Sequence, residues 1–159
     1  MRQIFFLAMG GMTLFALMAL ARAETADSHE ALATAEKFIE ALNKLDADAA
    51  RELMEPSATI ILSLRNEDGT PRHSIRNRDE YLATWDQLSG VTVEEKMWAP
   101  VIQSDGPIAT IWMDYALYID GAFRQCGKNG FNMIRQEDGW KIAGAVSSVR
   151  QLGCEDASR

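Results

Sequence analysis

The sequence predicts an α+β domain in which helices come first and a long, curved antiparallel meander is folded over them. Three observations support this order. Apolar residues recur at helical spacing in the first half of the chain, and from Val91 onward the period changes to two. Asp-Gly pairs fall in the gaps between the last four strand-like segments, where tight hairpin turns favour such residues. Because these connections are short, the four strands should be sequential antiparallel neighbours.

Residues 1–23 have the pattern of an export signal. Arg2 supplies the positive start, residues 4–20 are almost wholly apolar, and Ala21-Arg22-Ala23 is a small-x-small cleavage site. The alternative is an uncleaved membrane anchor, but the apolar run is shorter than the ~20 residues that a spanning helix needs. We therefore expect a signal peptide at residues 1–23, a single domain at residues 24–159, and a periplasmic or secreted location.

Length and charge limit the kinds of partner that the mature chain is expected to bind. Cleavage after Ala23 leaves 136 residues, which suits one compact domain. Removing Arg2 and Arg22 leaves 14 basic residues against 23 acidic ones, a formal charge of −9. Phosphate backbones and anionic lipids repel so acidic a domain. We therefore expect no nucleic acid as a partner and, after signal cleavage, no membrane.

Three helices are expected, each with a start signal. Asp27-Ser-His-Glu30 has the spacing of a capping box and opens the first helix, whose apolar residues form one stripe. Asp46 is placed to cap a short second helix. Asn77-Arg-Asp-Glu80 is another capping box, and it opens a third helix that contains Trp85.

Strands are expected between the second and third helices and throughout the second half. A β-branched and aliphatic run covers residues 58–64, and a polar loop follows it, before the third helix. In the segment 108–119, every other residue from Ala109 to Ile119 is apolar or amphipathic, so this set should face the helices. The four later strand-like segments are residues 91–103, 108–119, 122–135 and 140–150.

Two stretches of the chain resemble the nuclear transport factor 2-like superfamily. One is Ala-Leu-Asn-Lys-Leu-Asp-Ala-Asp-Ala at residues 41–49, within the expected helix pair. The other is Cys-Gly-x-x-Gly-Phe-x-x-Ile-Arg-x-x-Asp-Gly-Trp-Lys-Ile at residues 126–142, in the last hairpin. The chain is similar to the bacterial SnoaL-like and lumazine-binding-protein-like branches over about residues 27–154, as an exported member.

The resemblance implies a cone-shaped α+β barrel in which a curved antiparallel sheet and the helices enclose a pocket, often in a homodimer. Members of the superfamily include ketosteroid isomerases, dehydratases, polyketide cyclases and many non-catalytic binding modules. The matching motif belongs to the scaffold and brings no catalytic residue with it. The fold alone therefore does not predict a function.

Three residues are weak candidates for catalysis. An enzyme of this kind needs a base with a tuned pKa and a donor for developing oxyanion charge. His73 in the polar loop is one candidate base, although a solvated surface histidine is the simpler interpretation. Asp114 is another, but its parity directs it to the outer sheet face, and only a bulge would turn it inward. Tyr115 has the inward parity and either offers its hydroxyl to a ligand or is a core residue.

The remaining candidates are a set of aromatic residues and a basic cluster. The aromatic residues either line a pocket for a small apolar ligand or fill the core and the dimer face. The basic cluster either receives a ligand carboxylate or phosphate or is a solvated loop. The pocket candidates are Trp85, Trp98, Tyr115, Phe131 and Trp140, and the basic cluster is Arg72, Arg76 and Arg78.

No metal site and no cofactor are expected. The two cysteines and two histidines stand far apart, without the spacing of metal ligands. The chain has no Gly-rich phosphate loop and no nucleophile elbow.

Cys126 and Cys154 are the only two cysteines, and we expect them to form a disulfide. The even number and the oxidising compartment favour the bond. If Asp138-Gly139 is a two-residue loop, however, an unbroken hairpin places the two cysteines on opposite faces. Gly127 and Gly153 allow the chain to bulge and to turn back, which removes this obstacle. Two free thiols remain the alternative, and neither cysteine has a base nearby in the sequence that would make it catalytic.

Together these observations predict an exported small-molecule-binding or accessory domain, dimeric and without an evident catalytic constellation. One alternative is an isomerase, dehydratase or cyclase that uses a carboxylate base on a small apolar ligand inside the cone. A second alternative is a structural dimerisation module with a filled cone.

Overall fold

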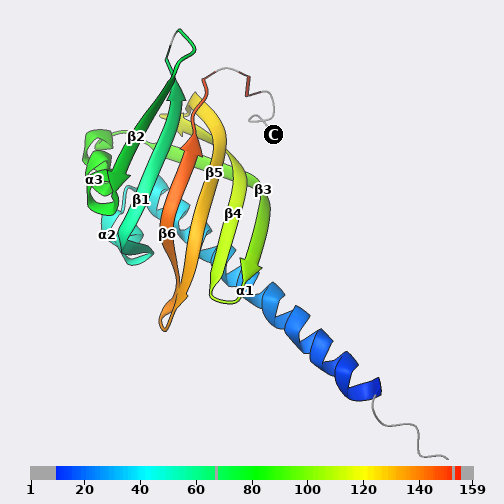
Figure 1. Ribbon diagram of the computed structural model, residues 1–159. Helices are drawn as coiled ribbons and strands as arrows, with labels where there is room; N and C mark the ends of the chain where they lie inside the picture. The colour runs from blue at the N-terminus through cyan, green and yellow to red at the C-terminus, as the bar shows by residue number, and fades with distance from the viewer. Residues whose placement is uncertain (1–9, 67, 152, 155–159) are drawn as a thin grey trace, which may run out of the picture.

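The computed structural model describes residues 10–66, 68–151 and 153–154 and has the expected α+β class (Figure 1). Its helices are α1 (Gly10–Lys44), α2 (Ala47–Glu52), α3 (Arg78–Ala83) and the 3₁₀ helix η1 (Thr84–Leu88). Its strands are β1 (Met54–Arg65), β2 (Pro71–Asn77), β3 (Val93–Asp105), β4 (Ile108–Ile119), β5 (Ala122–Gln136) and β6 (Gly139–Ser148). The described part of the chain contains no helix that is long and apolar enough to cross a membrane.

The six strands form one mixed sheet in the order β2-β1-β6-β5-β4-β3. β1 and β6 run parallel, and every other neighbouring pair is antiparallel. The expectation of a wholly antiparallel sheet closed into a barrel is therefore wrong: the sheet is mixed and open, with β2 and β3 at its edges. The meander from β3 to β6 is antiparallel because short turns join its strands. β1 reaches β6 through no such turn, so nothing forces that pair to be antiparallel.

The helix signals are confirmed in two of three places. The Asp46 side chain accepts a hydrogen bond from the Ala49 N–H at the start of α2, and Asn77 and Glu80 form the full capping box of α3. The first helix does not begin at Asp27, because α1 runs unbroken through this position. The Asp27 carboxylate instead pairs with Arg135 of β5, and a charged partner across the fold replaces the expected cap.

β2 was missed by the sequence analysis, which expected a polar loop before the third helix. Asp68 and Gly69 turn the chain back after β1, with Gly69 at a φ of 82° and the Thr70 N–H donating to the Asp68 carboxylate. The returning segment then pairs with β1 as an edge strand, with His73 opposite Ser63. An edge strand of exposed polar residues lacks the alternation that marks a half-buried strand.

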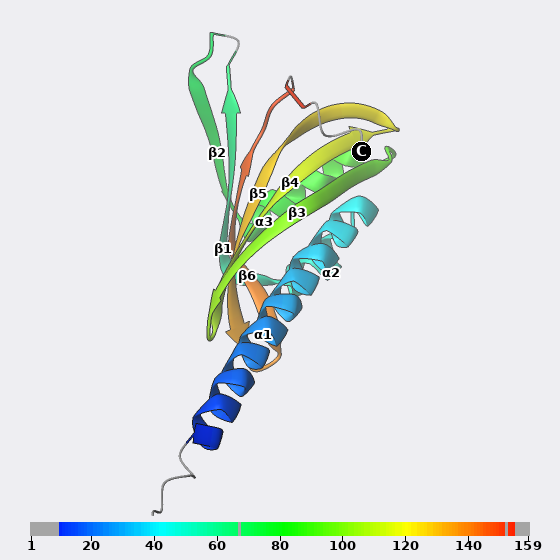
Figure 2. The same cartoon turned by 90° about the vertical axis from the view of Figure 1, so that its right-hand side faces the viewer.

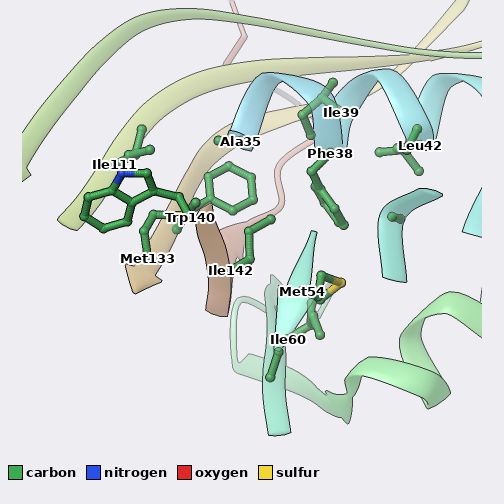
Figure 3. Packing of buried hydrophobic residues seen from close by; sticks show 14 of the residues in the cluster. Ala35, Phe38, Ile39, Leu42, Met54, Ile60, Ile111, Met133, Trp140 and Ile142 are labelled. Atoms are coloured by element: carbon green, nitrogen blue, oxygen red, sulfur yellow. The ribbon is translucent and has the colours of Figure 1, made fainter. Parts of the chain in front are cut away.

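α1 lies across the concave side of the sheet, closest to β3, while its N-terminal part projects beyond the sheet (Figures 1 and 2). The predicted inward parity of β4 is confirmed, since Ala109, Ile111 and Met113 are all buried. Figure 3 shows Phe38 and Ile39 of α1 above Met133 and Ile142 of the sheet. The concave face is therefore the core, and any inward polar group on it lies between the sheet and α1.

Candidate functional site

Four polar side chains interrupt the apolar concave face, one from each strand of the meander. They are Glu95 of β3, Tyr115 of β4, Asn129 of β5 and Ser147 of β6. The register brings them together: Met97, two residues after Glu95, lies opposite Tyr115, and Asn129 lies opposite Ser147. We call these four residues the polar cluster.

Glu95 is fixed at both its backbone and its side chain. Its N–H donates to Asn43 Oδ1 of α1 at 2.6 Å, and its carbonyl accepts from Asn43 Nδ2 at 3.1 Å. Its carboxylate oxygen Oε1 accepts from Asn129 Nδ2 at 2.7 Å. Ser147 in turn donates to Asn129 Oδ1 at 2.6 Å. The carboxylate therefore ends a chain of hydrogen bonds that crosses from β6 to β3.

Burial raises the pKa of Glu95 to about 7, and the hydrogen bond from Asn129 offsets only part of this rise. The side chain is partly buried between α1 and the sheet, where few polar groups stabilise the ionised form. Near neutral pH the carboxyl group is therefore divided between its protonated and ionised forms. Such a group both accepts and donates protons.

Two tyrosines lie within electrostatic reach of Glu95. Burial first, and then the negative charge of Glu95, raise the pKa of both Tyr81 and Tyr115 above the ordinary value. Both hydroxyls therefore stay protonated at neutral pH. The Tyr115 hydroxyl donates to the Ser148 carbonyl at 3.1 Å and accepts from the Gln125 amide at 3.3 Å.

A groove of about 310 Å³ opens between α1 and β3, and Glu95 is part of its wall. Beside the groove, the register of β3 against β4 shifts between Trp98 and Val101, and Ala99 has a φ of 51°. This bulge places Trp98 and Pro100 at the edge of the groove. The groove is lined by Leu32, Glu36, Ile39, Glu40, Asn43, Glu95, Met97, Trp98, Pro100 and Met113, and none of these is basic.

The structure brings some of the predicted pocket residues together and separates others. Trp98 lines the groove, and Tyr115 belongs to the polar cluster. Trp85 and Phe131 both pack against Phe38, with ring centroids 6.1 and 6.0 Å away, so they form the apolar floor beneath α1. Trp140 does not line the groove. It is buried beside Met133 and Ile111 in the core (Figure 3). Trp140 is the second residue of β6, next to the turn that joins β5 to β6.

Neither of the two remaining catalytic candidates reaches the polar cluster. Asp114 faces the convex side, as its parity predicts, and pairs with Lys128 at 2.6 Å. His73 is exposed on the edge strand β2, far along the sheet order from β3. Of the basic cluster, Arg78 pairs with Asp79 at 3.1 Å and Arg76 donates to Ser74, so both have partners in the protein. No group of three metal-ligating side chains occurs in the described part of the chain.

The sequence analysis missed Glu95 and Asn129. A signal for Glu95 was present, since it lies on the same parity as Val93 and Met97 and so shares their face of β3. Asn129 has the parity of Phe131, and the same argument places it inside. Glu95 stands among charged residues, and such a stretch usually indicates solvent-exposed side chains. The crossing of α1 over β3 buries Glu95.

The structure joins Cys126 and Cys154 in a disulfide with Cα atoms 6.0 Å apart. The hairpin register assumed from the sequence is wrong: Gly139 pairs with Gln136, so the loop is one residue earlier than Asp138-Gly139. A register shift further along β5 and β6 then brings Cys126 opposite Arg150. The chain turns after this bridge, with Gly153 at a φ of 71°, and carries the second cysteine back to the first.

No protein family profile and no curated protein matches the sequence. Solved structures do match the fold. An NTF2-like protein from Cytophaga hutchinsonii has a TM-score of 0.61 at 10% identity, over 75% of this chain and 94% of that chain. A conserved protein from Planctomyces limnophilus has a TM-score of 0.62 at 18% identity, over 80% and 99% of the two chains. A candidate dehydratase of the NTF2-like family from Streptomyces avermitilis has a TM-score of 0.59 at 14% identity, over 79% and 97%.

The protein therefore has the nuclear transport factor 2-like (NTF2-like) fold, and the resemblance seen in the sequence is confirmed at that level. At identities this low, the similarity concerns the backbone arrangement. It leaves the chemistry to be argued from the polar cluster itself.

Proposed function

We propose that the protein is an acid–base enzyme of the isomerase or dehydratase kind, with Glu95 as the group that accepts and returns the proton. The observation that carries this proposal is the partly buried Glu95 carboxyl, which borders the groove and has a pKa of about 7. A base is most effective when its pKa lies near the working pH, because it is then both available and strong enough. An ordinary surface glutamate is a much weaker base.

The surroundings of Glu95 suit a proton transfer that involves a small ligand. Leu32, Ile39 and Met113 supply apolar walls, as small-molecule sites usually require. Glu36 and Glu40 add negative charge to the same groove and repel anionic ligands. These walls therefore suit a small ligand that carries no negative charge.

The test is turnover of a panel of small conjugated ketones and β-hydroxy ketones, followed by their ultraviolet absorbance. The wild type should shift a double bond or remove water from at least one of them. Glu95→Gln should lose about 10²–10³-fold in rate with its fold intact, the size expected when a general base is removed. Glu94→Gln is the matched control, because its side chain is half exposed and pairs with Lys96 instead. Equal rates for Glu95→Gln and the wild type would overturn the proposal.

Binding without catalysis is the second candidate function. One observation favours it: the Tyr115 hydroxyl already has a donor and an acceptor within the protein, so it is not free to stabilise an oxyanion. Mass spectrometry of the natively purified protein would reveal a retained ligand. A ligand that is bound equally by the wild type and Glu95→Gln, and is unchanged after incubation, would support binding over catalysis.

We also propose that the protein is exported, because Ala21-Arg22-Ala23 has the pattern of a signal-peptide cleavage site. The mature protein should begin at Glu24 in the periplasm or medium. Intact-mass measurement of the exported protein decides this. A chain that keeps residues 1–23 would contradict the proposed location.

A homodimer through the convex face of the sheet completes the proposal. Val101 and Trp112 are cross-strand neighbours on that face and are 60% and 41% exposed. Exposed apolar side chains side by side are typical of contact surfaces. Val101→Lys should convert a dimer into a monomer in light scattering, and a wild type that is monomeric at micromolar concentration would rule the dimer out.

A further inference from the structure

The hydrogen bonds from Ser147 through Asn129 to Glu95 have a direction. Ser147 donates to Asn129 Oδ1 at 2.6 Å, and Asn129 Nδ2 donates to Glu95 Oε1 at 2.7 Å. While Glu95 is ionised, each donor in this chain faces an acceptor. A protonated Glu95 adds an O–H donor, and in this direction neither Asn129 nor Ser147 offers that donor an acceptor. Asn129 is 5% exposed, so water does not readily replace a lost partner.

The same three groups also fit together in the opposite direction. A protonated carboxyl group has an O–H donor, and a serine hydroxyl is both a donor and an acceptor. The oxygen and nitrogen of an amide have almost the same size, so a half rotation exchanges these two atoms and leaves the occupied space almost unchanged. Protonated Glu95 then donates to Asn129 Oδ1, and Asn129 Nδ2 donates to the Ser147 hydroxyl.

We propose that Asn129 and Ser147 are positioning residues for Glu95, and that the Asn129 side-chain amide rotates by half a turn each time Glu95 gains or loses its proton. This inference rests on the proposed acid–base function of Glu95. Its consequence is that Asn129 bonds to the carboxyl in both of its forms, as a donor to the ionised group and as an acceptor from the protonated one. Ser147 is essential to the arrangement because a hydroxyl can reverse its role.

A second amide on the opposite side of Glu95 provides a control within the same molecule. Asn43 bonds to the Glu95 backbone N–H and carbonyl, and these two groups never exchange the roles of donor and acceptor. The Asn43 amide therefore keeps one orientation whatever the state of the carboxyl. The other ionisable groups around Glu95 are Tyr81 and Tyr115, which stay protonated near neutral pH, and Glu36 and Glu40 on the groove wall.

The experiment is nuclear magnetic resonance of the oxidised, isotopically labelled mature chain, at about two pH units on each side of the Glu95 midpoint. Glu95 is followed by its carboxyl carbon, and each amide by nuclear Overhauser contacts of its Nδ2 protons. The Asn129 protons should contact the Glu95 side chain above the midpoint and the Ser147 side chain below it. The Asn43 protons should keep their contacts throughout. If Glu95 titrates and the Asn129 contacts stay unchanged, the inference is wrong while the proposed function stands.

Variants of Ser147 supply a second readout. Ser147→Ala leaves the turned amide with a buried N–H that has no acceptor, and an orphaned N–H is less tolerated than an orphaned carbonyl. The Glu95 midpoint should therefore shift downward in Ser147→Ala and return towards the wild-type value in Ser147→Thr. An upward shift would mean that Ser147 only locks the amide in its observed orientation, which contradicts the inference. A Glu95 that does not titrate near neutral pH in the wild type would remove both the inference and the proposed function.

Discussion

Replacing Glu95 with glutamine should stabilise the fold at high pH and leave it nearly unchanged at low pH. The folded protein holds the Glu95 proton more tightly than the unfolded chain does, because burial raises the pKa of this group from 4.5 to about 7. The stability that comes from this proton is therefore full below pH 4.5 and is lost as the pH rises through about 7. Glutamine has nearly the same shape, stays neutral and still accepts the bond from Asn129.

The size of the effect follows from the same two pKa values. The rise from 4.5 to about 7 corresponds to roughly 3 kcal/mol, at about 1.36 kcal/mol for each pKa unit. Because the carboxyl borders the groove and keeps some contact with solvent, the gain should be smaller than this limit. We expect Glu95→Gln to raise the free energy of unfolding by about 2 kcal/mol at about pH 9, and by close to zero at about pH 4.

Urea denaturation of both proteins at the two pH values, followed by tryptophan fluorescence, measures this difference. Other titrating groups are common to both chains, so they cancel when the variant is compared with the wild type at each pH. Glu94→Gln is the control, since its half-exposed side chain should give no pH-dependent gain. If Glu95→Gln gains the same amount at both pH values, the Glu95 carboxyl is not destabilised by burial and the proposed base is wrong.

Three further substitutions test the scaffold around the polar cluster. Cys154→Ser should lower the free energy of unfolding by roughly 3 kcal/mol or less, because its disulfide closes a loop with a sequence separation of 28, and should leave the Glu95 midpoint unchanged; two reactive thiols in the unreduced wild type would exclude the bond. Gly127→Ala should lower the free energy of unfolding by about 3 kcal/mol, since its Cβ would lie 1.8 Å from the Ser148 carbonyl oxygen. An unchanged urea denaturation midpoint would mean that the strands do not approach so closely. Asp114→Asn breaks an ion pair on the convex face and should cost less than ~1 kcal/mol without changing turnover; lost turnover in a folded variant would return Asp114 to the site.

The elements that local chemistry specifies could be predicted from the sequence. The Asp-Gly turns and the alternation from Ala109 to Ile119 fixed the meander, and Asp46 marked the start of α2 correctly. The start of α1 could not be predicted in this way. The helix runs through Asp27, and the carboxylate pairs with Arg135, more than a hundred residues away in the sequence. No local pattern encodes that contact.

The candidate site illustrates the same limit at the level of side chains. Asp114 and Glu95 are both acids within strands, and parity sends the first outward and the second inward. Parity names the face, but it does not say whether that face is covered. Glu95 acquires its raised pKa only because α1 crosses β3 and Asn43 fastens the two together. That crossing depends on the whole packing of the helix on the sheet, so the sequence pointed to the aromatic residues rather than to the carboxyl.

The hydrogen-bond geometry of the polar cluster depends on a backbone contact two residues away from it. At Gly127, β5 approaches Ser148 so closely that a side chain has no room there. The Lys128 N–H donates to the Ser148 hydroxyl at 3.0 Å and holds the strands in this register. The next pair in the ladder is Asn129 opposite Ser147. The glycine in the motif that suggested the fold therefore also sets the distance over which Ser147 reaches the Asn129 amide. For this reason Gly127→Ala should shift the Glu95 midpoint as well as the stability, whereas loss of the disulfide, which lies beyond the last ladder pair, should change stability alone.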